Sequence, residues 1–201
     1  MVTELALPDS VTSISNYAFA GCESLTSAII PSCVTSIGSQ AFFCCEGLTE
    51  IVIPNSITRI ESSTFGGCVS AVSIVIPDSV TYIGNSAFSG CKSLADIVIP
   101  NSVTAIGSGV FSGCTGLTEI VIPEGVYIIE ANTFSGCSNL QSVTLPSTLR
   151  ALRERAFGNC YSLESVILPN GMTSIGMSAF SDCISLASVY YCGTQEEWSE
   201  I

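Results

Sequence analysis

Residues 77–99 read PDSVTYIGNSAFSGCKSLADIVI, and almost all of the remaining chain is made of variants of this stretch. The eight prolines of the chain, from Pro8 to Pro169, follow one another at a constant spacing of 23 residues. A period of this length indicates a repeat architecture, in which each unit buries its apolar face against its neighbours. We therefore number positions within a repeat from its proline, and predict a single α/β repeat domain folded as a solenoid with 23-residue coils.

The columns of the repeat identify the core. Positions 4, 7, 18, 21 and 23 are almost exclusively aliphatic, and position 12 is phenylalanine in all eight repeats. Side chains at one position of successive coils stack along the axis of a solenoid, so position 12 predicts an aromatic spine. The spine would consist of Phe19, Phe42, Phe65, Phe88, Phe111, Phe134, Phe157 and Phe180.

Two stretches of each repeat predict parallel β-ladders. Positions 18 to 23, as in residues 117–122, alternate in polarity and are rich in β-branched residues, which favours a strand. Positions 4 to 7, as in residues 80–83, predict a second short extended piece. The segment between them has helical spacing and ends in a small residue, so we expect short helical or 3₁₀ turns there.

The ends of the chain depart from the repeat. We predict that residues 1–7 are the tail of a preceding repeat, that residues 8–191 form eight repeats, and that residues 192–201 begin a C-terminal cap. The first eight residues lack the positive start and apolar centre of a signal peptide. We therefore expect the chain to be a fragment of a longer array, without its signal peptide.

Charge and composition argue against several classes of function. Five basic residues against seventeen acidic ones give a net charge of -12, which disfavours nucleic acid and anionic lipid as partners. No apolar run approaches the roughly 20 residues of a membrane helix, so we expect no membrane insertion. The chain has no histidine, and its acidic residues lack the dense pattern of a calcium site. We predict no enzyme activity, no catalytic residue, no metal and no cofactor.

The eleven cysteines mostly follow the repeat. Eight of them occupy position 15, where equivalent places in a parallel stack favour a ladder of small buried thiols over disulfide bridges. Cys33, Cys44 and Cys192 lie outside that column. The chain has no Cys-x-x-Cys pair that could complete a zinc site.

Position 22 gives the candidate binding surface, because strand alternation turns it outward while its residues are mostly aliphatic. The acidic residues of position 20 border it, and Tyr82 is added because its column varies from repeat to repeat. β-branched residues are also simply good strand formers, so a structural reading of this column remains open. The candidate residues are Ile29, Val52, Val75, Val98, Val121, Ile167, Tyr190, Glu50, Asp96, Glu119 and Tyr82.

The unit Leu-x-x-Ile-x-Ile-Pro-x-x-Val-x-x-Ile-Gly-x-x-Ala-Phe-x-x-Cys, which runs from Leu94 to Cys114 with Val110 in the alanine place, resembles the BspA-like class of leucine-rich repeats. The resemblance covers residues 3–191. It implies a leucine-rich-repeat solenoid on the cell surface or secreted, in bacteria or certain parasitic protists. The asparagine ladder of other leucine-rich repeats cannot be carried over, because proline and a small polar residue stand in its place.

The resemblance also implies adhesion to host proteins, extracellular-matrix components or other cells. We therefore expect a non-catalytic module that binds a protein ligand from a bacterial surface. The alternative is a structural spacer that displays another domain and binds nothing itself.

Overall fold

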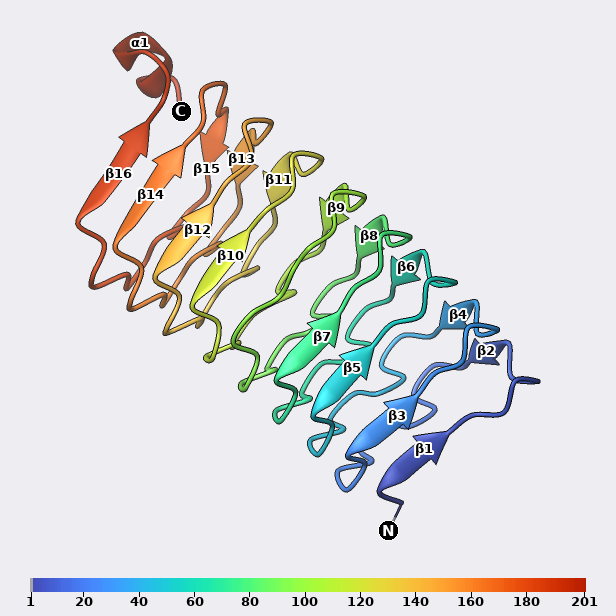
Figure 1. Cartoon of the computed structure of the whole chain (residues 1–201). Coiled ribbons are helices and arrows are strands. Elements are labelled where there is room, and N and C mark those ends of the chain that lie inside the picture. Colours follow the sequence, from blue (N-terminus) through green and yellow to red (C-terminus); the bar gives the residue numbers. More distant parts are fainter. Residues whose placement is uncertain (1) are drawn as a thin grey trace.

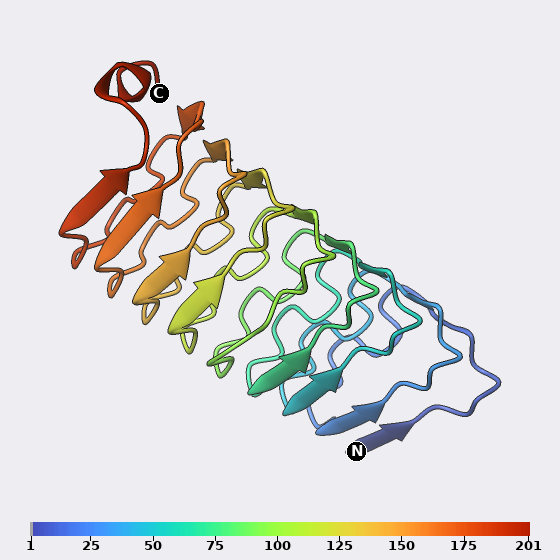
Figure 2. The same ribbon diagram turned by 45° about the horizontal axis from the view of Figure 1, so that its top comes forward.

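The computed structural model describes residues 2–201, which form an elongated stack of coils (Figure 1). All coils but one contribute one strand to a first ladder and one to a second ladder, so that the two ladders run along different sides of the stack (Figures 1 and 2). The predicted solenoid with 23-residue coils and two parallel ladders is confirmed.

The first ladder consists of β1 (Glu4–Ala6), β3 (Ser27–Ile29), β5 (Glu50–Val52), β7 (Ser73–Val75), β10 (Glu119–Val121), β12 (Ser142–Thr144), β14 (Ser165–Leu168) and β16 (Ser188–Tyr191). The second consists of β2 (Ser13–Ile14), β4 (Ser36–Ile37), β6 (Arg59–Ile60), β8 (Tyr82–Ile83), β9 (Ala105–Ile106), β11 (Ile128–Ile129), β13 (Ala151–Leu152) and β15 (Ser174–Ile175). Every strand pair is parallel, and paired residues such as Val52 and Val75 lie one repeat apart.

The strands are shorter than the sequence suggested, because the expected strand ends belong to turns. At position 4 the N–H of Val80 donates to the carbonyl of Pro77 at 3.0 Å, and at position 18 the N–H of Leu117 donates to Cys114 at 3.2 Å. Residues 96–98 form no strand, although they align with β7 and β10. The first ladder is thereby interrupted at its middle.

The third side of each coil consists of consecutive turns in place of the expected helical or 3₁₀ segment. The N–H groups of Ser86, Phe88 and Gly90 donate to carbonyls of the next coil at 2.8, 3.0 and 2.7 Å. The residue after each of these donates within its own coil, to the carbonyl three residues back, at 3.1–3.2 Å. A helix would direct every N–H along its own axis, whereas stacked coils offer alternate N–H groups a carbonyl in the next coil.

The predicted aromatic spine is confirmed. Successive position 12 rings stack with centroids 5.2–6.1 Å apart and planes within 21° of parallel. The aliphatic columns pack around these rings, and the six inner phenylalanines are almost completely buried. The core is therefore one continuous strip of apolar side chains along the axis.

The position 15 cysteines lie in a ladder beside the spine, as predicted. Each thiol from Cys45 to Cys183 donates to the carbonyl of the position 12 phenylalanine in the preceding coil, at 3.0–3.4 Å. Burial raises the pKa of the Cys45 thiol to about 11 and that of Cys137 to about 12. Burial likewise holds the pKa values of Cys91 and Cys114 well above the ordinary range. These thiols act as small buried donors.

Two of the remaining cysteines also follow columns of the repeat. Cys33 stands at position 3, where its thiol donates to the carbonyl of Val11 at 3.3 Å, as the Ser79 hydroxyl does to Ile57 at 2.7 Å. Cys44 stands at position 14, where most coils have glycine, and it adopts a φ of 55°. All eleven cysteines are free thiols.

The chain closes with α1 (Gln195–Trp198), the one helix among residues 2–201. Thr194 caps it, because its hydroxyl accepts from the N–H of Glu197 while the Glu197 carboxylate accepts from the N–H of Thr194. The ring of Trp198 lies 5.5 Å from that of Tyr191, at the end of β16. The role of residues 192–201 as the start of a cap stays a prediction.

Candidate protein-binding surface

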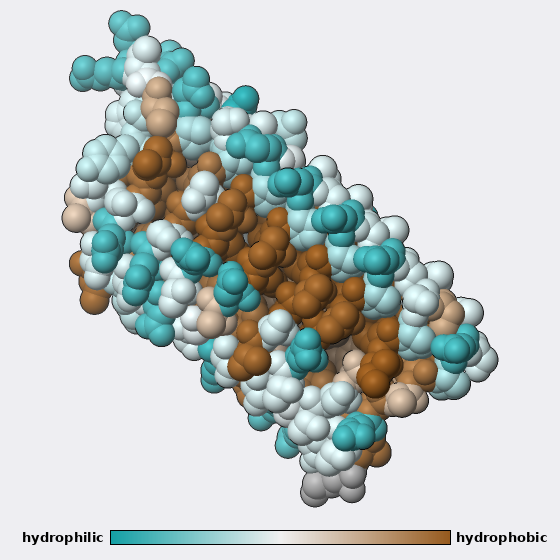
Figure 3. Space-filling view, viewed as in Figure 1, coloured by the Kyte–Doolittle hydropathy of each residue, from teal (hydrophilic) through white to brown (hydrophobic). Residues whose placement is uncertain are grey.

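A row of exposed aliphatic side chains runs along the first ladder, and we call it the aliphatic stripe. It consists of the position 22 residues Ile29, Val52, Val75, Val98 and Val121, followed after Thr144 by Ile167 and Tyr190. The exposed fractions of these apolar residues range from 48% at Val75 to 73% at Val98. The stripe appears in Figure 3 as the brown band over the strands of the first ladder, with hydrophilic residues along both edges.

Strand alternation explains why these residues are exposed. In β5 and β10 the first and third residues are exposed while the middle one is buried in the core. The outward orientation expected for position 22 is therefore observed. The same alternation turns position 20 outward, so Glu50 and Glu119 lie on the face that carries Val52 and Val121.

The stripe is hollowed where the ladder is interrupted. A groove of about 570 Å³ is lined by Asp78, Asp96, Val98, Glu119 and Val121, around the coil in which residues 96–98 form no strand. A second groove of about 320 Å³ lies between β3 and β5, where those strands belong to separate sheets. The second groove carries Ile29, Val52 and Glu50 in its lining.

Within residues 2–201, the carboxylates on this face have no cationic partner. Among the residues that the structure describes, the single ion pair joins Arg59 and Glu61, which border the second ladder. Asp78, Asp96 and Glu119 therefore give the larger groove an uncompensated negative charge. Asp78 was missed in the sequence, although its place directly after Pro77 is the turn through which the chain leaves the first ladder.

Tyr82 does not join the other candidate residues. It lies in β8 on the second ladder and is only half-exposed, because the guanidinium of Arg59 covers its ring at 4.1 Å. The remaining ten candidate residues all occupy outward positions of the first ladder. Tyr82 was included because its column varies, and that variation did not identify the ladder to which it belongs.

The described part of the chain contains no group of residues that would form a metal site or a membrane-spanning helix. No group of three or more cysteine, aspartate or glutamate side chains within residues 2–201 could hold a metal ion. Arg150, Arg153 and Arg155 are exposed, and none forms an ion pair within this range. None of the helical structure in residues 2–201 is long and apolar enough to cross a membrane.

Comparison with known proteins gives a consistent result. The family model for the BspA type leucine rich repeat region (6 copies) matches residues 1–118 and 104–200. No curated protein matches the sequence. Several solved structures do.

A leucine-rich repeat protein of Bacteroides ovatus is similar over 90% of this chain, with 32% identity and a TM-score of 0.78. The chain spans 59% of the length of that protein. The T. pallidum leucine rich repeat protein is 34% identical over 92% of this chain and 78% of its own, with a TM-score of 0.73. A leucine rich cell surface protein of Faecalibacterium prausnitzii aligns with 100% of this chain and 82% of its own, at 25% identity and a TM-score of 0.52.

Proposed function

Because the chain belongs to the BspA-type leucine-rich-repeat family, we propose that it is a non-catalytic protein-binding module that acts in adhesion on a bacterial cell surface or after secretion. The observation that carries this proposal is the aliphatic stripe, since exposed apolar patches of such length mark partner surfaces. The name of the Faecalibacterium prausnitzii protein, a leucine rich cell surface protein, supports the location.

The chemistry of the face supports a protein partner of a particular kind. An aliphatic stripe bordered by uncompensated carboxylates complements a surface that presents apolar side chains between lysines or arginines. Nucleic acid is disfavoured by the net charge of -12. We infer a protein ligand of this kind, from the extracellular matrix or from a host or neighbouring cell surface.

Serine substitutions in the stripe test the proposal. The triple variant Val75→Ser, Val98→Ser, Val121→Ser removes apolar area from exposed positions, so it leaves the fold intact. If these valines are covered in the complex, each loss amounts to about 1 kcal/mol, and the three losses together weaken binding by roughly a hundredfold. Surface plasmon resonance against immobilised collagen, laminin and fibronectin, and binding to epithelial cells, provide the measurement.

Met177→Ser, Ile184→Ser is the matched control, because both side chains are exposed and apolar but lie outside the stripe. It should bind as the unmodified chain does. Binding that survives the triple valine substitution would rule out the stripe as the contact surface. Failure of the unmodified chain to bind any of these proteins or cells would favour the alternative, a spacer that displays another domain.

A further inference from the structure

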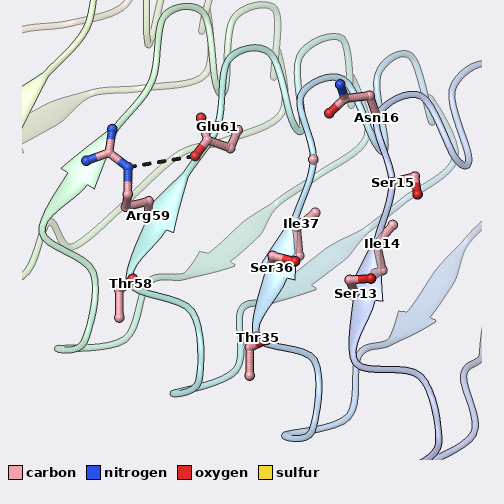
Figure 4. Close-up of a pocket in the computed structure, with 11 residues that line it drawn as sticks. Ser13, Ile14, Ser15, Asn16, Thr35, Ser36, Ile37, Thr58, Arg59 and Glu61 are labelled. Carbon is pink, nitrogen blue, oxygen red and sulfur yellow. Dashed lines mark ion pairs between the residues drawn. The ribbon is translucent and has the colours of Figure 1, made fainter.

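A polar groove separates β4 from β6 on the second ladder, on a different side of the coil from the aliphatic stripe (Figure 4). Its volume of about 410 Å³ falls within the range of roughly 300–1,000 Å³ that is typical of ligand pockets. Three successive coils line it with hydroxyl, guanidinium and carboxylate groups. The polar side chains that line it include those of Ser13, Thr35, Ser36, Thr58, Arg59 and Glu61.

The groove lies at a junction where two backbone hydrogen bonds are not made. At the next junction the N–H of Thr81 donates to the carbonyl of Thr58 at 2.9 Å, and the N–H of Gly84 donates to Ile60 at 2.8 Å. Within residues 2–201, the equivalent N–H groups of Thr58 and Glu61 make no backbone hydrogen bond to the coil before them. The groove therefore has backbone donors along one wall, and it has the carbonyls of Thr35 and Ile37 along the other.

The Thr58 hydroxyl also lacks the hydrogen bond that threonine hydroxyls at the same position make in other coils. The hydroxyls of Thr35, Thr81 and Thr104 each donate to the carbonyl of the same position in the preceding coil, at 3.3–3.4 Å. The Thr58 hydroxyl makes no such bond in the described part of the chain. It is exposed and lines the groove, so it can donate to a ligand and accept from it.

Arg59 is held in place at one side of the groove. Its Nε lies 3.7 Å from Oε1 of Glu61, and its guanidinium lies over the Tyr82 ring at 4.1 Å. Contact with two partners restricts the side chain while leaving further N–H donors of the fork unused. The arginine and glutamate together add no net charge to the site.

The polar lining distinguishes this groove from a second place where neighbouring coils lack the same backbone hydrogen bonds. The same two backbone bonds are missing between β9 and β11 within the described residues, but position 6 there holds Ala105 and Ile128. At the junction of β4 and β6, position 6 holds Ser36 and Arg59. Between β4 and β6, the missing backbone hydrogen bonds therefore coincide with side chains that can both donate and accept hydrogen bonds.

We propose that the groove between β4 and β6 binds a neutral saccharide. The hydroxyls of a sugar both donate and accept, which matches a site that offers free N–H groups, carbonyls and hydroxyls together. Ile14 and Ile37 also line the groove, but their side chains are almost completely buried in the core, so the ligand is held mainly by polar groups. An anionic ligand is disfavoured by the net charge of -12 and by the pairing of Arg59 with Glu61.

Titration followed by ¹⁵N–¹H correlation spectra tests this assignment on the full chain. The probes are lactose, maltotriose and chitotriose, with sialyllactose as the anionic counterpart of lactose. We expect at least one neutral sugar to shift the amide signals of residues 13–16, 35–38 and 58–61, and sialyllactose to bind more weakly than lactose. Thr58→Val should raise the Kd of that sugar about two- to tenfold, as expected for the loss of one hydrogen bond.

Thr81→Val is the matched control, because it removes a hydroxyl from the same column one coil further on. At that coil the hydrogen bonds to the preceding coil are made, so no groove opens there. Its Kd should equal that of the unmodified chain, and Ser36→Ala should weaken binding as Thr58→Val does. The proposal is overturned if no neutral probe shifts these amides at millimolar concentration, or if the shifts map to the aliphatic stripe. Equal weakening by Thr58→Val and Thr81→Val would also overturn it.

Discussion

Cys44 shows how a single residue can depart from the repeat without disturbing it. Position 14 has a positive φ in every coil, and five of the eight residues there are glycine. Asn159 and Asp182 are residue types that tolerate this conformation, whereas cysteine is not. The stacked coils on either side supply the hydrogen bonds that hold Cys44 at a φ of 55°.

Cys44→Gly should therefore stabilise the protein. Left-handed backbone costs a residue other than glycine about 1–2 kcal/mol, and the greater freedom of glycine in the unfolded chain offsets about 0.5–1 kcal/mol of this gain. We expect a net rise of about 0.5–1 kcal/mol in the free energy of unfolding, measured by urea denaturation.

Gly113→Ala provides the reciprocal measurement, because a Cβ at Gly113 would meet its nearest neighbour at an ordinary 3.9 Å. This substitution introduces only the unfavourable φ of 72°, so it should destabilise the protein by about 1 kcal/mol. If Cys44→Gly lowered the stability instead, the packing of the Cys44 side chain against Gly67 would outweigh the backbone term.

At the scale of the elements, the phenylalanine spine should contribute unequally along its length. Phe111 is completely buried and stacks on rings at 5.8 and 5.5 Å on its two sides. Phe19 is only half-buried and stacks on one ring within residues 2–201. Phe111→Ala should cost about 3–5 kcal/mol, and Phe19→Ala should cost clearly less. Urea unfolding of both variants measures this, and equal losses would contradict a spine whose contribution grows with burial.

The sequence predicted the elements well where the period of 23 residues determined them. The direction of each side chain, the spine and the thiol ladder follow from columns whose members are nearly identical. The left-handed turns could not be predicted in the same way, since position 10 has a positive φ in residues as different as Tyr17, Ser63 and Arg155. The stacked carbonyls of the next coil impose that conformation, and no residue type signals it.

The grooves could not be predicted from the sequence, for a related reason. Residues 96–98 read Asp-Ile-Val and form no strand, whereas the nearly identical Glu-Ile-Val of β5 and β10 does. Thr58 and Thr81 likewise share a residue type and a column, but only Thr81 bonds to the preceding coil. Whether a junction between coils opens depends on the arrangement of whole coils, so only the outward direction of the binding-surface residues was predictable.

For the whole molecule, the thiol ladder should make the free energy of unfolding fall as the pH becomes alkaline. Burial is the main cause that raises the pKa values of Cys45, Cys68, Cys91, Cys114 and Cys137 above their usual 9.0. Below pH 9.0 these thiols are protonated in both the folded and the unfolded chain, so their contribution to stability is fully present. Above it the unfolded chain releases protons that the folded chain retains, and stability falls with rising pH until the folded pKa values are reached.

The expected loss is steep. Each such thiol lowers the free energy of unfolding by about 1.4 kcal/mol for every pH unit above its unfolded pKa, so five together lower it by about 7 kcal/mol. A domain of ordinary stability, about 5–15 kcal/mol, should then unfold within about two pH units. Urea unfolding followed by circular dichroism between pH 8 and pH 11 measures the slope.

Cys114→Ala separates the thiols from other groups that titrate at high pH. The variant removes one ionisable group from the unfolded chain, and the carbonyl of Phe88 still accepts from the N–H of Cys91 at 3.2 Å. Its stability at pH 8 should fall slightly, while its loss of stability per pH unit above pH 9 should be smaller by about 1.4 kcal/mol. An unchanged slope would mean that ionisation of Cys114 is not linked to unfolding, and that the thiol is accessible to hydroxide in the folded solenoid.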